Sequence, residues 1–111
     1  MFISLEQIIQ AKNTLAGVLV PTTLQYSKTF STMSGNEVYM KPECLQKTGA
    51  FKLRGAYNKI ANLTQEQKNR GIITTSSGNH GAATAYSAML HGIKATVIMP
   101  IKHSPPKRAA I

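Results

Sequence analysis

The feature that most constrains the fold is a pair of short apolar runs, residues 72–75 and 95–99, separated by an alanine-rich segment. Short apolar runs bounded by turn residues are typical of buried strands. A turn at residues 76–81 leads into the alanine-rich segment, which ends near Gly92 and is long enough for a helix. Strand, helix and strand in this order place the two strands parallel in one sheet, so the sequence predicts an α/β fold.

The chain ahead of this unit shows patterns for a helix and a strand. Ser4 and Gln7 can form a capping box before apolar residues at helical spacing, which predicts a helix over residues 5–16. We expect residues 21–34 to be extended or irregular. A turn signal followed by alternating apolar and polar residues predicts a short strand over residues 37–41.

A second helix is expected over residues 50–62, with Lys52 at its very start. A pair of prolines ahead of residues 107–111 predicts the first turn of a further helix there, since proline is favoured at helix starts. The expected sheet then has three parallel strands, which leave faces and edges uncovered. We therefore expect residues 1–111 to be an incomplete, N-terminal part of one larger domain.

Composition excludes several classes of protein. A hydrophobic content of 42% with 15% charged residues is typical of a globular domain rather than of a disordered chain. No apolar run approaches the roughly 20 residues of a membrane span, and the N-terminus lacks a secretory pattern, so we expect a cytoplasmic protein with no membrane partner. Cys44 is the single cysteine and the three histidines are scattered, so we expect no disulfide and no metal site.

The formal net charge of +9 raises nucleic-acid binding as an alternative function. The basic residues are scattered, however, and aromatic residues are not interleaved with them as a stacking surface requires. Acidic sequence lying elsewhere in the protein would explain the imbalance equally well. We therefore expect no nucleic-acid partner.

The first stretch that could carry chemistry surrounds Lys52 and reads Lys-Thr-Gly-Ala-Phe-Lys-Leu-Arg-Gly-Ala over residues 47–56. The positive end of a helix dipole disfavours a protonated amine, and the apolar neighbour Phe51 adds desolvation in the same direction. A neutral amine can form a Schiff base with an aldehyde cofactor and later act as a base. The alternative is an ordinary surface lysine near a solvated Arg54, because motifs built on one lysine match often by chance.

The second stretch is Thr-Ser-Ser-Gly-Asn-His-Gly over residues 75–81, a turn from a strand into a helix. Such a turn presents backbone N–H groups, hydroxyls and an amide at the carboxyl end of a parallel strand, where open α/β sheets bind ligands. A carboxylate or phosphate would fit there. The alternative is an ordinary helix cap, with Ser77 or Asn79 satisfying the free N–H groups.

Taken together, the two stretches are more specific than either alone. The chain resembles the fold type II family of pyridoxal phosphate enzymes, within it the branch of threonine dehydratases, serine dehydratases and serine racemases. The resemblance covers nearly the whole chain. It rests on the opening helix, Pro-Thr-Thr-Leu at 21–24, the run at 41–56, Ser-Ser-Gly-Asn-His-Gly at 76–81 and Val-Ile-Met-Pro at 97–100.

The resemblance implies the three-layer, parallel-sheet fold of the tryptophan synthase β-like enzymes and the cofactor pyridoxal 5'-phosphate. It implies that Lys52 holds the cofactor as a Schiff base and, once displaced by substrate, removes the α-proton. Phe51 would lie against the cofactor ring, and Asn79 would hydrogen-bond the ring hydroxyl. The implied residues for the substrate carboxylate are Ser76, Ser77, Gly78, Asn79 and His80.

The implied reaction is β-elimination of L-threonine or L-serine to 2-oxobutanoate or pyruvate plus ammonia, which belongs to amino-acid metabolism and, for threonine, to isoleucine biosynthesis. Serine racemases share the lysine, and in them the residue matching Ser77 protonates the opposite face, so racemisation stays an alternative. Ala50 stands where many relatives carry serine, and residues 81–83 depart from a common small-Gln-Gly pattern.

The resemblance also implies what else the reaction needs. The family's glycine-rich loop for the cofactor phosphate and its residue facing the pyridine nitrogen come later in the chain than Ile111. We therefore expect residues 1–111 alone to be inactive. We also expect the full-length protein to be a homo-oligomer. A non-catalytic remnant that acts as an interaction module is the alternative from a different class of function.

Overall fold

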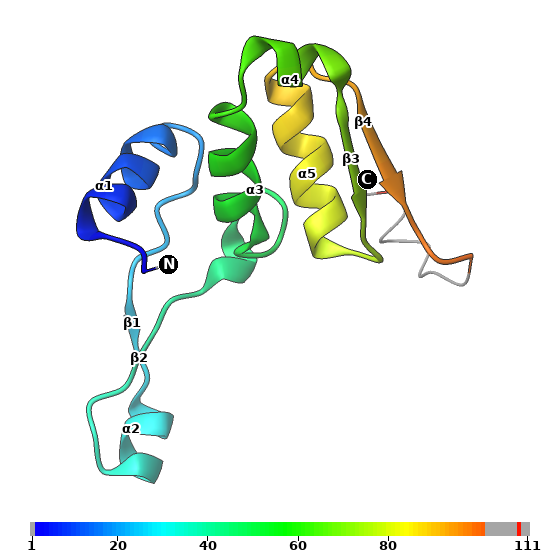
Figure 1. Cartoon of the computed structure of the whole chain (residues 1–111). Helices are drawn as coiled ribbons and strands as arrows, with labels where there is room; N and C mark the ends of the chain where they lie inside the picture. Colours follow the sequence, from blue (N-terminus) through cyan, green and yellow to red (C-terminus); the bar gives the residue numbers. More distant parts are fainter. Residues whose placement is uncertain (1, 102–108, 110–111) are drawn as a thin grey trace.

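Two parallel strands and the helix that connects them form one side of the computed structural model, which describes residues 2–101 and 109 (Figure 1). β3 (Ile72–Thr75) pairs with β4 (Ala95–Ile98) from Ile72 opposite Ala95 to Thr75 opposite Ile98. Helix α5 (Asn79–Leu90) connects them. This unit confirms the expected α/β class with a parallel sheet.

Helix α3 (Lys52–Ala61) packs beside α5, which lies between α3 and the strands (Figure 1). Two clusters of buried side chains hold the helices together. One cluster joins Leu53 and Ala56 to Ala83, and the other joins Ile60 to Ala88 and Ile93. Because early residues of α3 meet early residues of α5 and late meet late, the two helices run in the same direction.

The N-terminal helix forms as its capping residues predict. α1 (Leu5–Thr14) begins after Ser4, whose hydroxyl accepts a hydrogen bond from Gln7 N while the Gln7 side chain accepts one from Ser4 N. The helix ends earlier than the expected residue 16. None of its residues is buried, so its apolar face lies open.

The segment expected to be extended or irregular, residues 21–34, contains a helix that we did not predict. β1 (Gln25–Tyr26) is followed by α2 (Lys28–Ser34). The helix begins after Ser27, because the Ser27 hydroxyl caps it by accepting from Phe30 N. The helix ends at Gly35, whose φ of 69° is in the left-handed region that glycine adopts without strain.

The strand expected over residues 37–41 is only β2 (Tyr39–Met40), and it does not join the parallel sheet. It pairs antiparallel with β1, with Tyr26 opposite Tyr39. The expectation of three parallel strands was therefore wrong. β1, α2 and β2 form an arm, residues 25–40, that extends away from α3 and α5 (Figure 1).

Two short elements complete the described chain. The 3₁₀ helix η1 (Glu43–Leu45) follows the arm, and α4 (Gln65–Arg70) joins α3 to β3. We did not predict α4, although Thr64 and Gln67 form a capping box at its start. The helical turn expected over residues 107–111 lies outside the described residues, apart from position 109.

None of the helices in the described part of the chain has the length and apolar character that crossing a membrane requires. Within the same residues, His, Cys, Asp and Glu side chains nowhere gather in a group of three that could bind a metal ion. Cys44 is an exposed free thiol.

Candidate functional site

Lys52 is the first residue of α3, as its motif predicts. The loop before it turns at Gly49, which has a φ of 68° and donates its N–H to Gln46 O at 2.7 Å. Ala50 and Leu53 on either side of the lysine are buried, and Leu53 has no exposed surface. These two apolar anchors leave the Lys52 side chain on the exposed face of the helix.

The Lys52 amine lies over the ring of Phe51, 4.9 Å from the ring centroid. The ring is 56% exposed, so it adjoins the amine but shields it less from solvent than the sequence led us to expect. The ion pairs of the described residues are Glu43 with Arg54 and Glu66 with Arg70, and Lys52 takes part in neither. Its amine is therefore accessible to an incoming electrophile.

The turn after β3 is built around Ser76. Ser76 N donates to Ile98 O at 3.0 Å, which extends the parallel pairing by one residue. The Ser76 hydroxyl oxygen accepts from Gly78 N at 3.2 Å and from Gly81 N at 2.9 Å. Ser76 thus engages two backbone N–H groups at the start of α5, a task that the alternative of an ordinary helix cap gave to Ser77 or Asn79.

Ser77 and Asn79 are left exposed by this arrangement. No hydrogen bond within the described residues engages either side chain, so a hydroxyl and an amide remain free at the start of α5. The resemblance assigns these two residues to the substrate and the cofactor, and their exposure fits a ligand-binding role.

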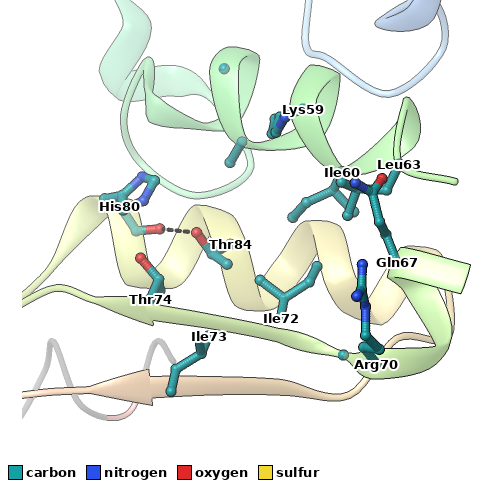
Figure 2. Close-up of a pocket in the computed structure, with 13 residues that line it drawn as sticks. Lys59, Ile60, Leu63, Gln67, Arg70, Ile72, Ile73, Thr74, His80 and Thr84 are labelled. Atoms are coloured by element: carbon teal, nitrogen blue, oxygen red, sulfur yellow. Dashed lines mark hydrogen bonds between the residues drawn. The ribbon is translucent and has the colours of Figure 1, made fainter.

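His80 occupies a different place. Its side chain borders a cavity of about 480 Å³ between α3, α4, β3 and α5, which Lys59 and Thr84 also line (Figure 2). Neither Lys52 nor residues 76–79 line this cavity. The described residues therefore do not bring His80 into one pocket with the lysine.

The parallel course of α3 and α5 brings the two motifs to the same end of the helix pair (Figure 1). Lys52 is the first residue of α3 and Asn79 is the first residue of α5. The buried contact between Leu53, in the first turn of α3, and Ala83, in the second turn of α5, fixes this juxtaposition. An amine, two hydroxyls and an amide therefore border one end of the molecule.

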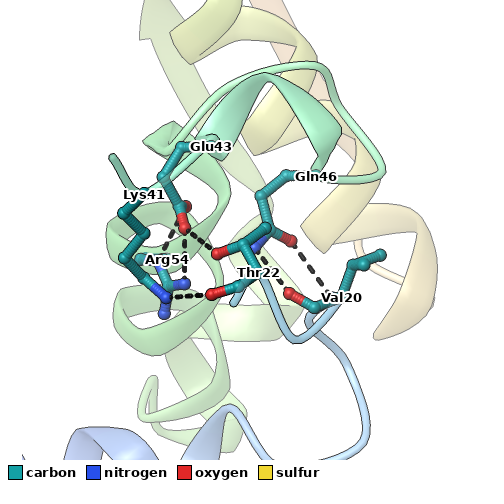
Figure 3. A network of polar contacts seen from close by, with 6 residues as sticks. All are labelled: Val20, Thr22, Lys41, Glu43, Gln46 and Arg54. Carbon is teal, nitrogen blue, oxygen red and sulfur yellow. Dashed lines mark hydrogen bonds and ion pairs between the residues drawn. The ribbon is translucent and has the colours of Figure 1, made fainter. Parts of the chain in front are cut away.

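A polar network just beyond Lys52 was not predicted from the sequence (Figure 3). Arg54 Nε and Nη2 donate to the two carboxylate oxygens of Glu43 at 2.8 and 2.7 Å. The guanidinium is the main cause that lowers the pKa of Glu43 to about 2, and the carboxylate in turn raises the pKa of Arg54. The only sequence signal was that Glu43 is one of four acidic residues in a strongly basic chain.

Comparison with known proteins places the chain among enzymes. The family model described as "Pyridoxal-phosphate dependent enzyme" matches residues 15–111. The L-threonine ammonia-lyase of Thermotoga maritima is 50% identical over 98 residues, which are 88% of this chain and 24% of that protein. The catabolic L-threonine dehydratase of Escherichia coli is 38% identical over 108 residues, 97% of this chain and 32% of that protein.

A solved structure shows the same similarity in three dimensions. The serine racemase of Dictyostelium discoideum superimposes with a TM-score of 0.90 at 36% identity, over 97% of this chain and 36% of that protein. The resemblance drawn from the motifs is confirmed. The chain spans about a quarter to a third of the length of the proteins that it matches.

Proposed function

Since the chain belongs to the family of pyridoxal-phosphate dependent enzymes, we propose that it forms the lysine-bearing part of a threonine or serine ammonia-lyase. The observation that carries the proposal is that Lys52, with no carboxylate partner among the described residues, begins α3 at the same end of the helix pair as residues 76–79. Relatives named as threonine ammonia-lyase and threonine dehydratase support the choice of reaction.

The residues present fit pyridoxal phosphate. A primary amine suits its aldehyde, and the exposed ring of Phe51 beside that amine offers a surface for a planar aromatic group. The Thr48 hydroxyl oxygen, in the loop that leads to Lys52, is buried without a hydrogen-bond partner in the described structure. A polar group from outside these residues would satisfy it.

We assign each side chain one task. Lys52 Nζ would hold the cofactor and, once free, accept the proton from the substrate α-carbon. Phe51 would lie against the ring and Asn79 would hydrogen-bond its hydroxyl. The hydroxyl of Ser77 and the backbone N–H groups of Ser77 and Asn79 would bind the substrate carboxylate at the start of α5, since Gly78 N already donates to the Ser76 hydroxyl. Bound pyridoxal phosphate supplies the electron sink for the carbanion at the α-carbon.

Ser76 and His80 take modified parts in this proposal. Because the Ser76 oxygen accepts from two backbone N–H groups and its own proton donates to Gly78 O at 3.4 Å, we assign it to holding the turn in shape. His80 borders the cavity beside α3, so a role toward the carboxylate requires its ring to turn toward residues 77–79.

The net reaction converts L-threonine to 2-oxobutanoate and ammonia, or L-serine to pyruvate and ammonia. Serine racemisation is the second candidate, because a serine racemase superimposes closely on the chain and because Ser77 offers an exposed hydroxyl. We further propose a cytoplasmic location and a homo-oligomeric full-length enzyme. We also propose that residues 1–111 alone do not turn over.

The test uses the native protein that contains this chain. Borohydride reduction followed by peptide mapping is expected to find a pyridoxyl group on Lys52, and 2-oxo acid release from L-threonine or L-serine is expected to accompany it. Lys52→Ala is expected to lose both. Lys59→Ala, which removes another exposed lysine of α3, is the matched control and is expected to keep both. Labelling of a different lysine, or of none, would contradict the proposal.

A further inference from the structure

We propose that the ion pair between Glu43 and Arg54 is a positioning device for Lys52, which sets the direction of its amine. The inference rests on the function proposed above. It assigns a task to Glu43, to which the sequence analysis gave no role, and to Arg54, which one interpretation of its motif left solvated.

The pair closes the loop that carries the lysine. Glu43 is the first residue of η1 and Arg54 lies in the first turn of α3, so the carboxylate and the guanidinium meet across the residues that lead into the helix. Two parallel N–H···O bonds at 2.8 and 2.7 Å hold the guanidinium in one plane. The N-cap residue of α3, Phe51, makes no capping hydrogen bond with its side chain, so no capping side chain fixes this end.

Leu53 and Arg54 together fix the rotation of the helix start. Successive residues of a helix point about 100° apart, so Arg54 points about 200° from Lys52 and Leu53 lies between them. Leu53 is anchored in the core and Arg54 is anchored on Glu43. The core contacts of Leu53, Ala56 and Ile60 hold one face of α3, and the ion pair of Arg54 holds its first turn in a second direction. Together they set where Lys52 points.

Glu43 is itself held from the other side (Figure 3). The Thr22 hydroxyl donates to Glu43 Oε1 at 2.7 Å, and Lys41 Nζ donates to the backbone oxygen of Thr22 at 2.6 Å. The buried Gln46 side chain bonds both backbone groups of Val20, at 3.1 and 2.9 Å. The carboxylate is therefore fixed to the segment after α1 as well as to α3. We call the ion pair of Glu43 and Arg54 the clamp.

The depressed pKa of Glu43 keeps the clamp charged at all pH values well above 2. The device thus acts continuously and is not a pH switch near neutrality. An exposed ion pair of ordinary geometry contributes little to stability. The bidentate geometry and the links to Thr22 and Lys41 distinguish this pair from the exposed pair of Glu66 and Arg70, whose nitrogen and oxygen lie 3.7 Å apart.

The test compares the two pairs in the native protein that contains this chain. Arg54→Lys keeps the charge but cannot donate two parallel bonds, and Glu43→Gln keeps the shape but removes the charge. Arg70→Lys and Glu66→Gln are the matched controls. For each variant we would measure the free energy of unfolding, the rate at which the cofactor-free protein takes up pyridoxal phosphate on Lys52, and kcat and KM for the preferred amino acid.

Both clamp variants are expected to lose about tenfold to a hundredfold in kcat, since misplacing a reacting group by about 1 Å costs that much. KM is expected to change less than about twofold while the uptake rate falls with kcat, because the defect lies in the lysine and not in the carboxylate site. The controls are expected to match wild type.

Two outcomes overturn the inference. One is wild-type uptake and kcat in both clamp variants. The other is a fall in uptake rate and kcat that vanishes once both are corrected for the folded fraction, because a purely structural ion pair would act only through stability. If wild-type protein takes up no pyridoxal phosphate on Lys52, the proposed function fails and takes the inference with it. The wild-type sample therefore separates the two failures.

Discussion

Leu53 and Ala83 are both fully buried and belong to one cluster, so the first turn of α3 is pinned to the second turn of α5. Neither residue carries out chemistry. Their contact nevertheless decides that the lysine at the start of one helix and the polar turn at the start of the other lie at the same end of the molecule.

Leu53→Ala is expected to lower the free energy of unfolding by about 2 to 5 kcal/mol, because it leaves a cavity beside Ala83 in the seam between the helices. Urea unfolding checks this. Leu5→Ala, at an exposed position of α1, is the control and is expected to change stability by less than about 0.5 kcal/mol. Equal effects at the two positions would show that the seam is not the core of the fold.

Acid is expected to weaken the wild-type protein through Glu43. Its folded pKa is about 2 against a model-compound value of 4.5, so the unfolded state binds more protons between these values. The stability that this carboxylate contributes is complete above about pH 4.5 and is lost as the pH falls toward 2. Glu43→Gln removes the group, so the difference in unfolding free energy between wild type and variant should shrink from pH 6 to pH 3. A constant difference across that range would contradict the prediction.

Gly71→Ala is expected to be more damaging than Gly35→Ala. Both glycines have a positive φ, at 80° and 69°, which costs about 1 to 3 kcal/mol for a residue with a side chain. A Cβ at Gly71 would also lie 2.9 Å from the backbone oxygen of Lys94, whereas a Cβ at Gly35 meets no atom within 4 Å. The melting temperature of Gly71→Ala should therefore be lower than that of Gly35→Ala. The reverse order would refute the close approach of Gly71 to the turn before β4.

Ser77→Ala is expected to separate elimination from racemisation in the native protein. In the racemisation alternative the Ser77 hydroxyl also reaches the face opposite Lys52, so the variant should lose any interconversion of L- and D-serine. It should keep part of its 2-oxo acid release, because the backbone N–H groups at the start of α5 still bind the substrate carboxylate. Chiral chromatography and a 2-oxo acid assay on the same sample measure the two activities. Loss of elimination to the same degree would show that Ser77 mainly binds the carboxylate.

Residues 1–111 alone are expected to retain no pyridoxal phosphate after gel filtration and to release no 2-oxo acid. The described residues supply an amine and several hydrogen-bonding groups, but among them no glycine-rich loop that could cradle the cofactor phosphate. Absorbance of the eluted protein and the same 2-oxo acid assay check both parts. Detectable turnover by the isolated chain would refute this prediction.

The parts of the fold that the sequence predicts are those with a long or apolar pattern. β3, α5 and β4 follow from two apolar runs around an alanine-rich segment, and α3 follows from its helical spacing. β2 lies within the strand predicted over residues 37–41, but β1 has only two residues, too few to show alternation, so the pairing of Tyr26 with Tyr39 could not be predicted from the sequence. The local signal for α2 is its capping residue Ser27.

The candidate site likewise has features that local sequence patterns predict and features that depend on the folded structure. The positions of Lys52 and Asn79 at helix starts follow from local patterns, and the structure agrees. The capping role of Ser76 depends on where the turn places its hydroxyl, and the partnership of Arg54 with Glu43 depends on the 3₁₀ turn of η1. Geometry of this kind arises only once the chain has folded.

The small side chains of α5 have a consequence for motion. The buried positions of this helix are occupied by glycine, alanine, serine and threonine, packed between α3 and the strands. Short side chains have few alternative rotamers, and a close-packed seam has little free volume into which a helix could slide. We therefore expect the lysine and the polar turn to move as one rigid body, so that the distance between them stays constant when the rest of the protein moves.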